Sequence, residues 1–293
     1  MTASILDGVS DIFDDWLGLF GNRSYGTKPH VAKYHSKKAS MELSRRGGPL
    51  PFDGRSVMSA KDAITKAMSR LENNLDNSQK TNASAANWKW EKSLHLSPKN
   101  RSPEKVMEKV VTFLFGDAWV NQIPTCNGLV PEGSSASRID LAHRLRPKHY
   151  ELIELKFGVT EDKPGSDYPL YAAMELLEYA LMYMLFRKRH LLGNALGKDH
   201  ALLCAKCIDL VVLAPIDWYN FGPPSREAYK FGWLEEAINQ GLTQYLVPPD
   251  YNFQMHFRFE VLPAEITTSF AHLMKDVYTF RDDALQSRRA LYR

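Results

Sequence analysis

The sequence is poor in cysteine and lacks several short motifs, and these absences exclude a number of protein classes. Its 293 residues include only three cysteines, so a zinc or iron–sulfur site of four thiolates cannot be completed from this chain. The chain has no P-loop, no G-x-G-x-x-G turn and no H-E-x-x-H helix. A small, odd number of cysteines favours a reducing compartment, and we interpret the cysteines, including the C-x-x-C of Cys204 and Cys207, as structural or incidental.

A long hydrophobic run and a secretory leader are also missing. The most apolar stretch, residues 170–186, contains Glu175 and Glu178, which predicts a buried helix rather than a membrane span. The first residues carry acids before the apolar positions instead of a basic segment, so we expect no signal peptide. These features predict a cytoplasmic protein that does not associate with membranes.

Charge is nearly balanced over the whole chain, with a formal net charge of +3, but it is uneven. Residues 23–46 carry seven basic side chains against the single acid Glu42. Such a cluster suits a phosphate backbone, and a solvated arm without a partner is the alternative. The breaker-rich composition of residues 21–54 predicts a loop or arm. The candidate nucleic-acid-binding residues here are Lys28, Lys33, Lys37, Lys38, Arg45 and Arg46.

Two helices are predicted near the N-terminus. Over residues 5–20, apolar side chains recur at helical spacing opposite four aspartates, which indicates an amphipathic helix. We expect this helix to pack on its own chain, or alternatively to dock onto a protein partner or a second copy. The second helix is predicted over residues 60–75, with Ser59 as its N-cap.

Trp88 and Trp90 follow a stretch rich in Asn, Ser and Ala and are interleaved with lysines. Alternating aromatic and basic residues suit base stacking, whereas core anchoring is the alternative for two tryptophans in a strand. We therefore divide the chain into a helical and basic accessory region, residues 1–98, and a main domain, residues 99–293.

The most informative stretch, residues 137–158, alternates as two strands do on either side of Pro147. A hairpin folded symmetrically about this proline places Asp140 opposite Glu154, and the period of two puts Lys156 on the same face. Facing carboxylates repel each other, but a divalent cation would convert them into a ligand set. The Lys156 ammonium would then hold an attacking water or stabilise developing phosphate charge. A surface hairpin with a solvated charged face is the alternative.

The order of Asp140 and then Glu154-Leu155-Lys156 resembles the signature of the PD-(D/E)XK nuclease superfamily. Ile139 stands where a proline often precedes the first acid. The resemblance implies an α/β fold with a restriction-endonuclease-like core, in which helices flank a central mixed sheet, here with a mainly helical N-terminal extension. It also implies Mg²⁺- or Mn²⁺-dependent cleavage of phosphodiester bonds, with DNA as the expected substrate. We expect Asp140, Glu154 and the Leu155 carbonyl to bind the metal, and Lys156 to be catalytic.

The helices on either side of the hairpin add further candidates through the same resemblance. In the superfamily, the preceding helix often donates one more glutamate, and Glu108 is the candidate here, with an exposed helix glutamate as the alternative. A Gln-x-x-x-Tyr pair often follows on the next helix. Glu175 and Tyr179 have that spacing, with glutamate in place of glutamine, and are candidates for contacts to the metal side or the nucleic-acid backbone.

The other predicted elements follow the order expected of such a domain. They are helices over residues 103–115, 170–190, 226–241 and 267–293, and strands over residues 119–124, 207–215 and 254–262. Two further functions stay open: a catalytically inactive module of the same fold that binds nucleic acid or a protein partner, and an interaction protein that docks through its N-terminal helix.

Overall fold

A computed structural model of the chain describes residues 4–19, 31–49, 57–78, 83–95, 102–131, 137–156, 168–193, 198–220, 227–247, 251–262 and 289–290. The α-helices are α1 (Val9–Trp16), α2 (Lys37–Arg46), α3 (Ala60–Asp76), α4 (Pro103–Leu114), α5 (Pro169–Lys188) and α6 (Gly232–Tyr245). The strands are β1 (Trp119–Pro124), β2 (Arg138–Arg146), β3 (His149–Leu155), β4 (Cys207–Pro215), β5 (Gln254–Leu262) and β6 (Arg289–Ala290). A short 3-10 segment, η1 (Lys33–His35), precedes α2.

The strands form one mixed sheet in the order β1-β2-β3-β4-β5-β6. Strands β1, β2 and β3 are antiparallel neighbours, β3, β4 and β5 are parallel, and β6 is antiparallel to β5. The two parallel connections contain α5 and α6, as crossovers between parallel strands usually do. Strand β4 is apolar and buried along nearly its whole length because both of its faces are covered.

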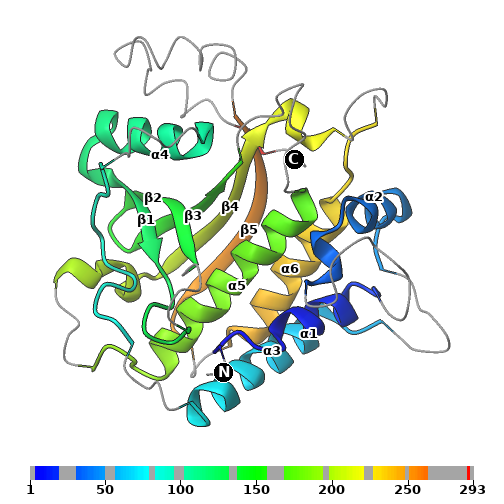
Figure 1. Cartoon of the computed structure of the whole chain (residues 1–293), viewed down its shortest axis with the longest axis horizontal. Helices are drawn as coiled ribbons and strands as arrows, with labels where there is room; N and C mark the ends of the chain where they lie inside the picture. Colours follow the sequence, from blue (N-terminus) through cyan, green and yellow to red (C-terminus); the bar gives the residue numbers. More distant parts are fainter. Residues whose placement is uncertain are drawn as a thin grey trace.

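Helices cover both faces of the sheet and give the molecule a layered architecture (Figure 1). Helix α4 lies on one face, where its apolar side packs on residues of β1 to β4. Helices α5 and α6 lie on the other face, and α1 and α3 form a further layer outside them. The α/β class and the mixed sheet flanked by helices are therefore as predicted.

Two of the predicted helices begin at capping sequences that act locally. Ser102 accepts a hydrogen bond from the backbone N–H of Lys105, and proline occupies the first turn of α4. In α3, the Ser59 hydroxyl accepts a hydrogen bond from the Asp62 backbone N–H at 3.1 Å. Each of these helix starts is confirmed, because the signal lies within four residues of sequence.

The prediction of a loop or arm over residues 21–54 is wrong for residues 37–46, which form α2. Ser36 caps this helix by accepting a hydrogen bond from the Lys38 N–H, and Gly47 ends it with φ of 70°. Three small side chains form most of its buried side, which gave little apolar periodicity to detect; the buried residues are Ala39, Ser40, Leu43 and Ser44.

The helix predicted over residues 267–293 is wrong at residues 289–290, which form β6. Residues 263–288 and 291–293 lie outside the described residues. Backbone pairing with the edge of β5 decides the conformation of β6, and helical periodicity in the sequence carries no information about that pairing.

Helix α1 packs on its own chain, the first of the two alternatives expected for it. Its residues Val9, Phe13 and Trp16 are buried in the core that α5 and α6 share with the sheet. Trp88 is also fully enclosed there, with its ring 5.3 Å from that of Tyr183, so it anchors the core and is not available to stack bases. The boundary drawn at residue 98 therefore does not separate two cores within the described part of the chain.

No helix among the described residues combines the length and the apolar character needed to cross a bilayer.

The contact between α3 and α6 depends on a glycine. A Cβ atom added at Gly241 would lie 2.9 Å from Ala60 Cβ and 3.0 Å from Ile64 Cδ1. Hydrogen in place of a side chain lets the two helices approach closely.

We expect Gly241→Ala to lower the free energy of unfolding by roughly 1–2 kcal/mol, because overpacking outweighs the gain in helix propensity. Urea unfolding measures this change. Gln240→Ala, on the exposed side of the same helix, is the control and should change the stability by less than about 0.5 kcal/mol. A Gly241→Ala protein as stable as wild type would show that the helices separate at no cost.

Candidate functional site

The predicted hairpin is confirmed, and its register places the two carboxylates opposite each other. Leu141 pairs with Ile153, so the next residue along each strand pairs Asp140 with Glu154. The backbone N–H of Leu155 donates a hydrogen bond to Asp140 Oδ2 at 3.1 Å. Asp140 is thus fixed against the end of β3, immediately beside the Glu-x-Lys sequence.

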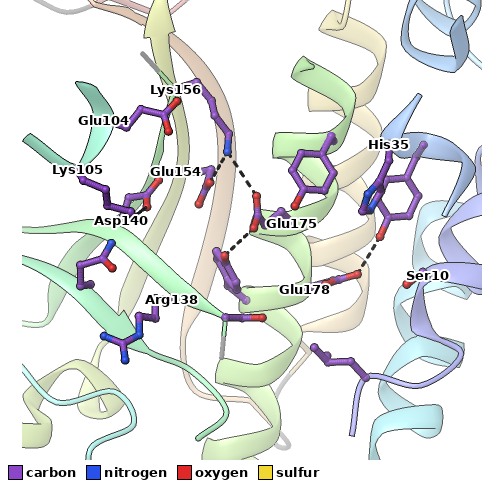
Figure 2. Close-up of a pocket in the computed structure, with 16 residues that line it drawn as sticks. Ser10, His35, Glu104, Lys105, Arg138, Asp140, Glu154, Lys156, Glu175 and Glu178 are labelled. Atoms are coloured by element: carbon purple, nitrogen blue, oxygen red, sulfur yellow. Dashed lines mark hydrogen bonds and ion pairs between the residues drawn. The ribbon is translucent and has the colours of Figure 1, made fainter. Parts of the chain in front are cut away.

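Asp140, Glu154 and Lys156 are buried, with relative exposures of 8%, 3% and 5%. The alternative of a solvated surface hairpin is therefore wrong. All three side chains line a cavity of about 490 Å³ between the sheet, α4, α5 and the N-terminal segment (Figure 2). Five carboxylates and three basic side chains line it; the acids are Glu104, Asp140, Glu154, Glu175 and Glu178, and the bases are Lys105, Arg138 and Lys156.

Lys105 connects two of the acids and was not identified from the sequence. Its Nζ lies 2.8 Å from Glu108 Oε1 and 3.0 Å from Asp140 Oδ1. Glu108 is fully buried, so the alternative of an exposed helix glutamate is wrong. The i,i+3 spacing of Lys105 and Glu108 on one helix was a signal for their pairing, but their approach to β2 depends on how α4 packs.

Lys156 forms a second bridge on the α5 side of the cavity. Its Nζ lies 2.8 Å from Glu154 Oε1 and 3.6 Å from Glu175 Oε2. The hydroxyl of Tyr179 donates to Glu175 Oε1 at 3.0 Å. The structure thus brings Glu175 of the predicted pair into contact with the predicted catalytic lysine, and Tyr179 is linked to that lysine through Glu175.

The crowded charge shifts the pKa values of the buried acids. Burial, followed by the charge of Asp140, raises the pKa of Glu154 well above its usual range. The same two causes raise the pKa of Glu108 to about 8, although Lys105 opposes the shift. Burial alone would lower the pKa of Lys105, but Asp140 and Glu108 outweigh it and raise that pKa. The cavity is therefore short of positive charge.

The donor set suits a hard divalent cation. Oε2 of Glu154 is buried and has no hydrogen-bond partner among the residues that the structure describes. Carboxylate oxygens are the ligands that Mg²⁺ and Mn²⁺ prefer, and an added cation would offset the excess of acids. Asp140 and Glu154 would hold such an ion from facing strands, with Glu108 next to Asp140 on the α4 side. The Leu155 carbonyl lies at the end of β3, and its role as a ligand stays a prediction.

The N-terminal segment forms the wall that sequence reasoning missed. Tyr34 and His35 of η1 line the cavity, and the Tyr34 hydroxyl donates to Glu178 Oε1 at 2.9 Å. Asp14 of α1 holds η1 in place, since its carboxylate accepts hydrogen bonds from the backbone N–H groups of Lys33 and Tyr34 at 2.8 and 3.0 Å. The contact between Tyr34 and Glu178 spans 144 residues of sequence, and no local pattern indicated it.

The basic candidates of the N-terminal segment lie on α2 and η1, apart from Lys28, which is outside the described residues. Lys33 Nζ donates to the carbonyl of Leu19 at 2.8 Å, which gives this side chain a structural contact. Arg45 and Arg46 both form ion pairs. Arg45 Nη2 lies 3.1 Å from Glu227 Oε2, and Arg46 Nη2 lies 2.7 Å from Glu42 Oε1. Lys37 and Lys38 are exposed at the start of α2, shortly after the residues that line the cavity.

A second group of metal-type donors lies at the opposite end of β3. His149, Cys207 and Asp209 offer donor atoms that all lie within 4.8 Å of one another. Sequence spacing did not reveal this group, because His149 and Asp209 are 60 residues apart. Arg258 Nη1 lies 3.0 Å from Asp209 Oδ2, so a guanidinium already compensates the only carboxylate of the group.

The fold and the site thus define an α/β protein with a buried acidic cavity at the end of a central hairpin. No protein-family model, curated protein or solved structure matches the chain.

Glu178 gives the cavity wall a measurable pH dependence. Burial raises the pKa of Glu178 to about 7. The hydrogen bond from Tyr34 opposes this shift, and the charge of Glu175 adds to it. Between about pH 4.5 and 7, the folded protein keeps a proton that the unfolded chain has released, so stability falls as the pH rises through this window. The slope from this one group is at most about 1.4 kcal/mol per pH unit.

We expect Glu178→Gln to flatten the decline of the unfolding free energy between pH 5 and 7, because glutamine has no proton to release yet still accepts the Tyr34 hydrogen bond. Urea unfolding at several pH values measures the slope. Glu236→Gln, at an exposed position of α6, is the matched control. A variant with the wild-type slope would exclude Glu178 as the source.

Proposed function

We propose that this chain is a metal-dependent nuclease of the PD-(D/E)XK type that hydrolyses phosphodiester bonds, with DNA as its substrate. The observation that supports this proposal most strongly is the burial of Asp140, Glu154 and Lys156 together in one acidic cavity. Buried acids that face each other across a hairpin repel and destabilise a fold, so a function is a reason for such a pair to be present. Strongly perturbed acids in a cavity are typical of functional sites.

In this proposal, Asp140, Glu154 and the Leu155 carbonyl hold Mg²⁺ or Mn²⁺, and Glu108 supports Asp140. When bound, such an ion neutralises charge on the scissile phosphate and lowers the pKa of a water molecule. Lys156 positions that water, and it is placed to do so because Glu154 and Glu175 hold its ammonium group from two sides. Tyr179 orients Glu175 through the 3.0 Å hydrogen bond.

The surface beside the cavity supports a polyanionic substrate. Helix α2 begins at Lys37, two residues after His35, which lines the cavity. Its exposed lysines Lys37 and Lys38 place positive charge on the N-terminal segment, shortly after the residues that line the acidic cavity. Phosphate contacts of this kind supply affinity without sequence preference.

One observation favours a second candidate function, a module of the same fold that binds nucleic acid without cutting it. The Lys105 ammonium already bridges Glu108 and Asp140, where a metal ion would otherwise be expected. Cleavage in this cavity therefore requires the ion to compete with a lysine, and a module that never cuts requires no such exchange.

We expect Asp140→Asn and Lys156→Ala each to reduce cleavage by about a hundredfold or more, because these changes remove ligand charge or water positioning. Neither change removes core packing, but Lys156→Ala leaves Glu154 and Glu175 without their bridging cation, so it should also lower the free energy of unfolding, which urea unfolding measures. The measurement is cleavage of single- and double-stranded DNA and RNA with Mg²⁺ or Mn²⁺. Asp117→Asn, at an exposed position beside Lys92, is the matched control.

Mutants that cut as fast as wild type would mean that the site assignment is wrong. A wild-type protein that binds metal and nucleic acid but never cuts would favour the binding module.

We expect the double change of Lys37 and Lys38 to glutamine to weaken DNA binding for all sequences alike and to flatten its salt dependence. Each lost phosphate contact reduces the slope of log K against log salt concentration by roughly 0.7–0.9. Titrations at several salt concentrations measure the slope. The same double change at Lys61 and Lys66, exposed on α3, alters the net charge equally and is the control. Identical slopes for the two variants would leave α2 without a role in binding.

A further inference from the structure

The candidate site is a recess, which restricts what can reach it. The carboxylates of β2 and β3 face Ser10, Tyr34 and His35 across a cavity of about 490 Å³ (Figure 2). This is the volume of a small-molecule pocket, enough for one or two nucleotides but not for a base-paired duplex. Asp140, Glu154 and Lys156 are each less than a tenth exposed, so a phosphate must enter the cavity to reach them.

An aromatic pair stands at the wall of this recess, beside the proposed catalytic lysine. The ring centroids of His35 and Tyr171 lie 4.3 Å apart, with an angle of 66° between their planes. Lys156 Nζ lies 5.6 Å from the centre of the Tyr171 ring. Tyr171 precedes Glu175 by one helical turn on α5, and His35 comes from the N-terminal wall. Both side chains line the cavity and are only partly buried, and the His35 ring also packs against Tyr34, with the ring centroids 4.8 Å apart.

We propose that His35 and Tyr171 hold an unpaired base, so that the substrate of this site is single-stranded DNA or the unpaired end of a duplex. Cleavage of such a substrate depends on the proposed nuclease function, but binding of the unpaired base does not. Aromatic side chains stack on any base, because every base has a π-face, so the contact demands an unpaired base without reading its identity. A paired base would have to be extruded from the duplex at an energetic cost before it could enter.

The geometry also links the stacked base to the chemistry. With a base on the Tyr171 ring, beside Lys156, the backbone phosphate of the same nucleotide lies in the cavity that Glu154 and Asp140 also line. Arg138 on the opposite wall then faces the outgoing nucleic-acid strand with positive charge, whereas Lys105 is held by Glu108 and Asp140. The cavity therefore combines one base-binding wall and one phosphate-binding wall.

The test uses the full chain, a fluorescent oligothymidine and a blunt duplex of mixed sequence. Binding is measured in EDTA and cleavage in Mn²⁺, for wild type, His35→Ala, Tyr171→Ala and Tyr171→Phe. We expect wild type to bind and cut the single strand at least tenfold better than the duplex. Each alanine variant should lose roughly tenfold in affinity for the single strand, and Tyr171→Phe should keep it, because phenylalanine retains the stacking face.

The controls separate stacking from a general loss of structure. His256→Ala and Phe113→Ala remove exposed rings outside the cavity and should bind as wild type does. Thermal melting identifies any alanine variant that fails to fold. If one of the two fails, the other decides the question, and if both fail, the preference of the wild-type protein for the single strand over the duplex decides it.

The outcomes distinguish this inference from the nuclease proposal. Binding of the single strand in EDTA that depends on His35 and Tyr171, without any cleavage, supports the base site and rejects the nuclease. Cleavage that Asp140→Asn abolishes but that is equal on duplex and single strand, or unchanged in both alanine variants, supports the nuclease and rejects the base site. A wild-type protein that neither binds nor cuts rejects both.

Discussion

Compensation of buried negative charge is the constraint on which this structure depends. The hairpin register places Asp140 opposite Glu154, while α4 and α5 add Glu108 and Glu175 from the two flanking layers. Two lysine ammonium groups bridge these acids, one on the α4 side and one on the α5 side. Unpaired carboxylates at this depth would be costly, so the lysines stabilise the assembled layers as well as the cavity.

The N-terminal segment couples the stability of the outer layer to the shape of the cavity. The carboxylate of Asp14 is buried and holds the backbone of η1, and η1 in turn presents Tyr34 to Glu178 on α5. Burial raises the pKa of Asp14 to about 6, in spite of these backbone hydrogen bonds. The wall that makes the site a recess is therefore part of the same core as α1 and α5, and not an appended flap.

A second charge network, centred on Arg258 of β5, shows the same principle with a different result. There Arg258 contacts Glu151, Asp209 and Glu260, while the ring of His143 stacks on Trp119 and its Nδ1 lies 2.9 Å from Glu151. Every acid of this network has a cationic or imidazole partner within the protein. At the other site, Asp140, Glu154 and Glu175 line an open cavity, and this difference is what separates a candidate binding site from a structural charge network.

The sequence by itself determined the hairpin, its register and the faces of Asp140, Glu154 and Lys156, because strand alternation and a proline turn act over a few residues. It also determined the starts of α3 and α4, where the caps are local. Only the tertiary structure decided that Lys105, Glu178, Tyr34 and His35 complete the cavity, and that residues 37–46 are helical. These features depend on packing between elements far apart in the chain, and spacing along one sequence does not encode distances across layers.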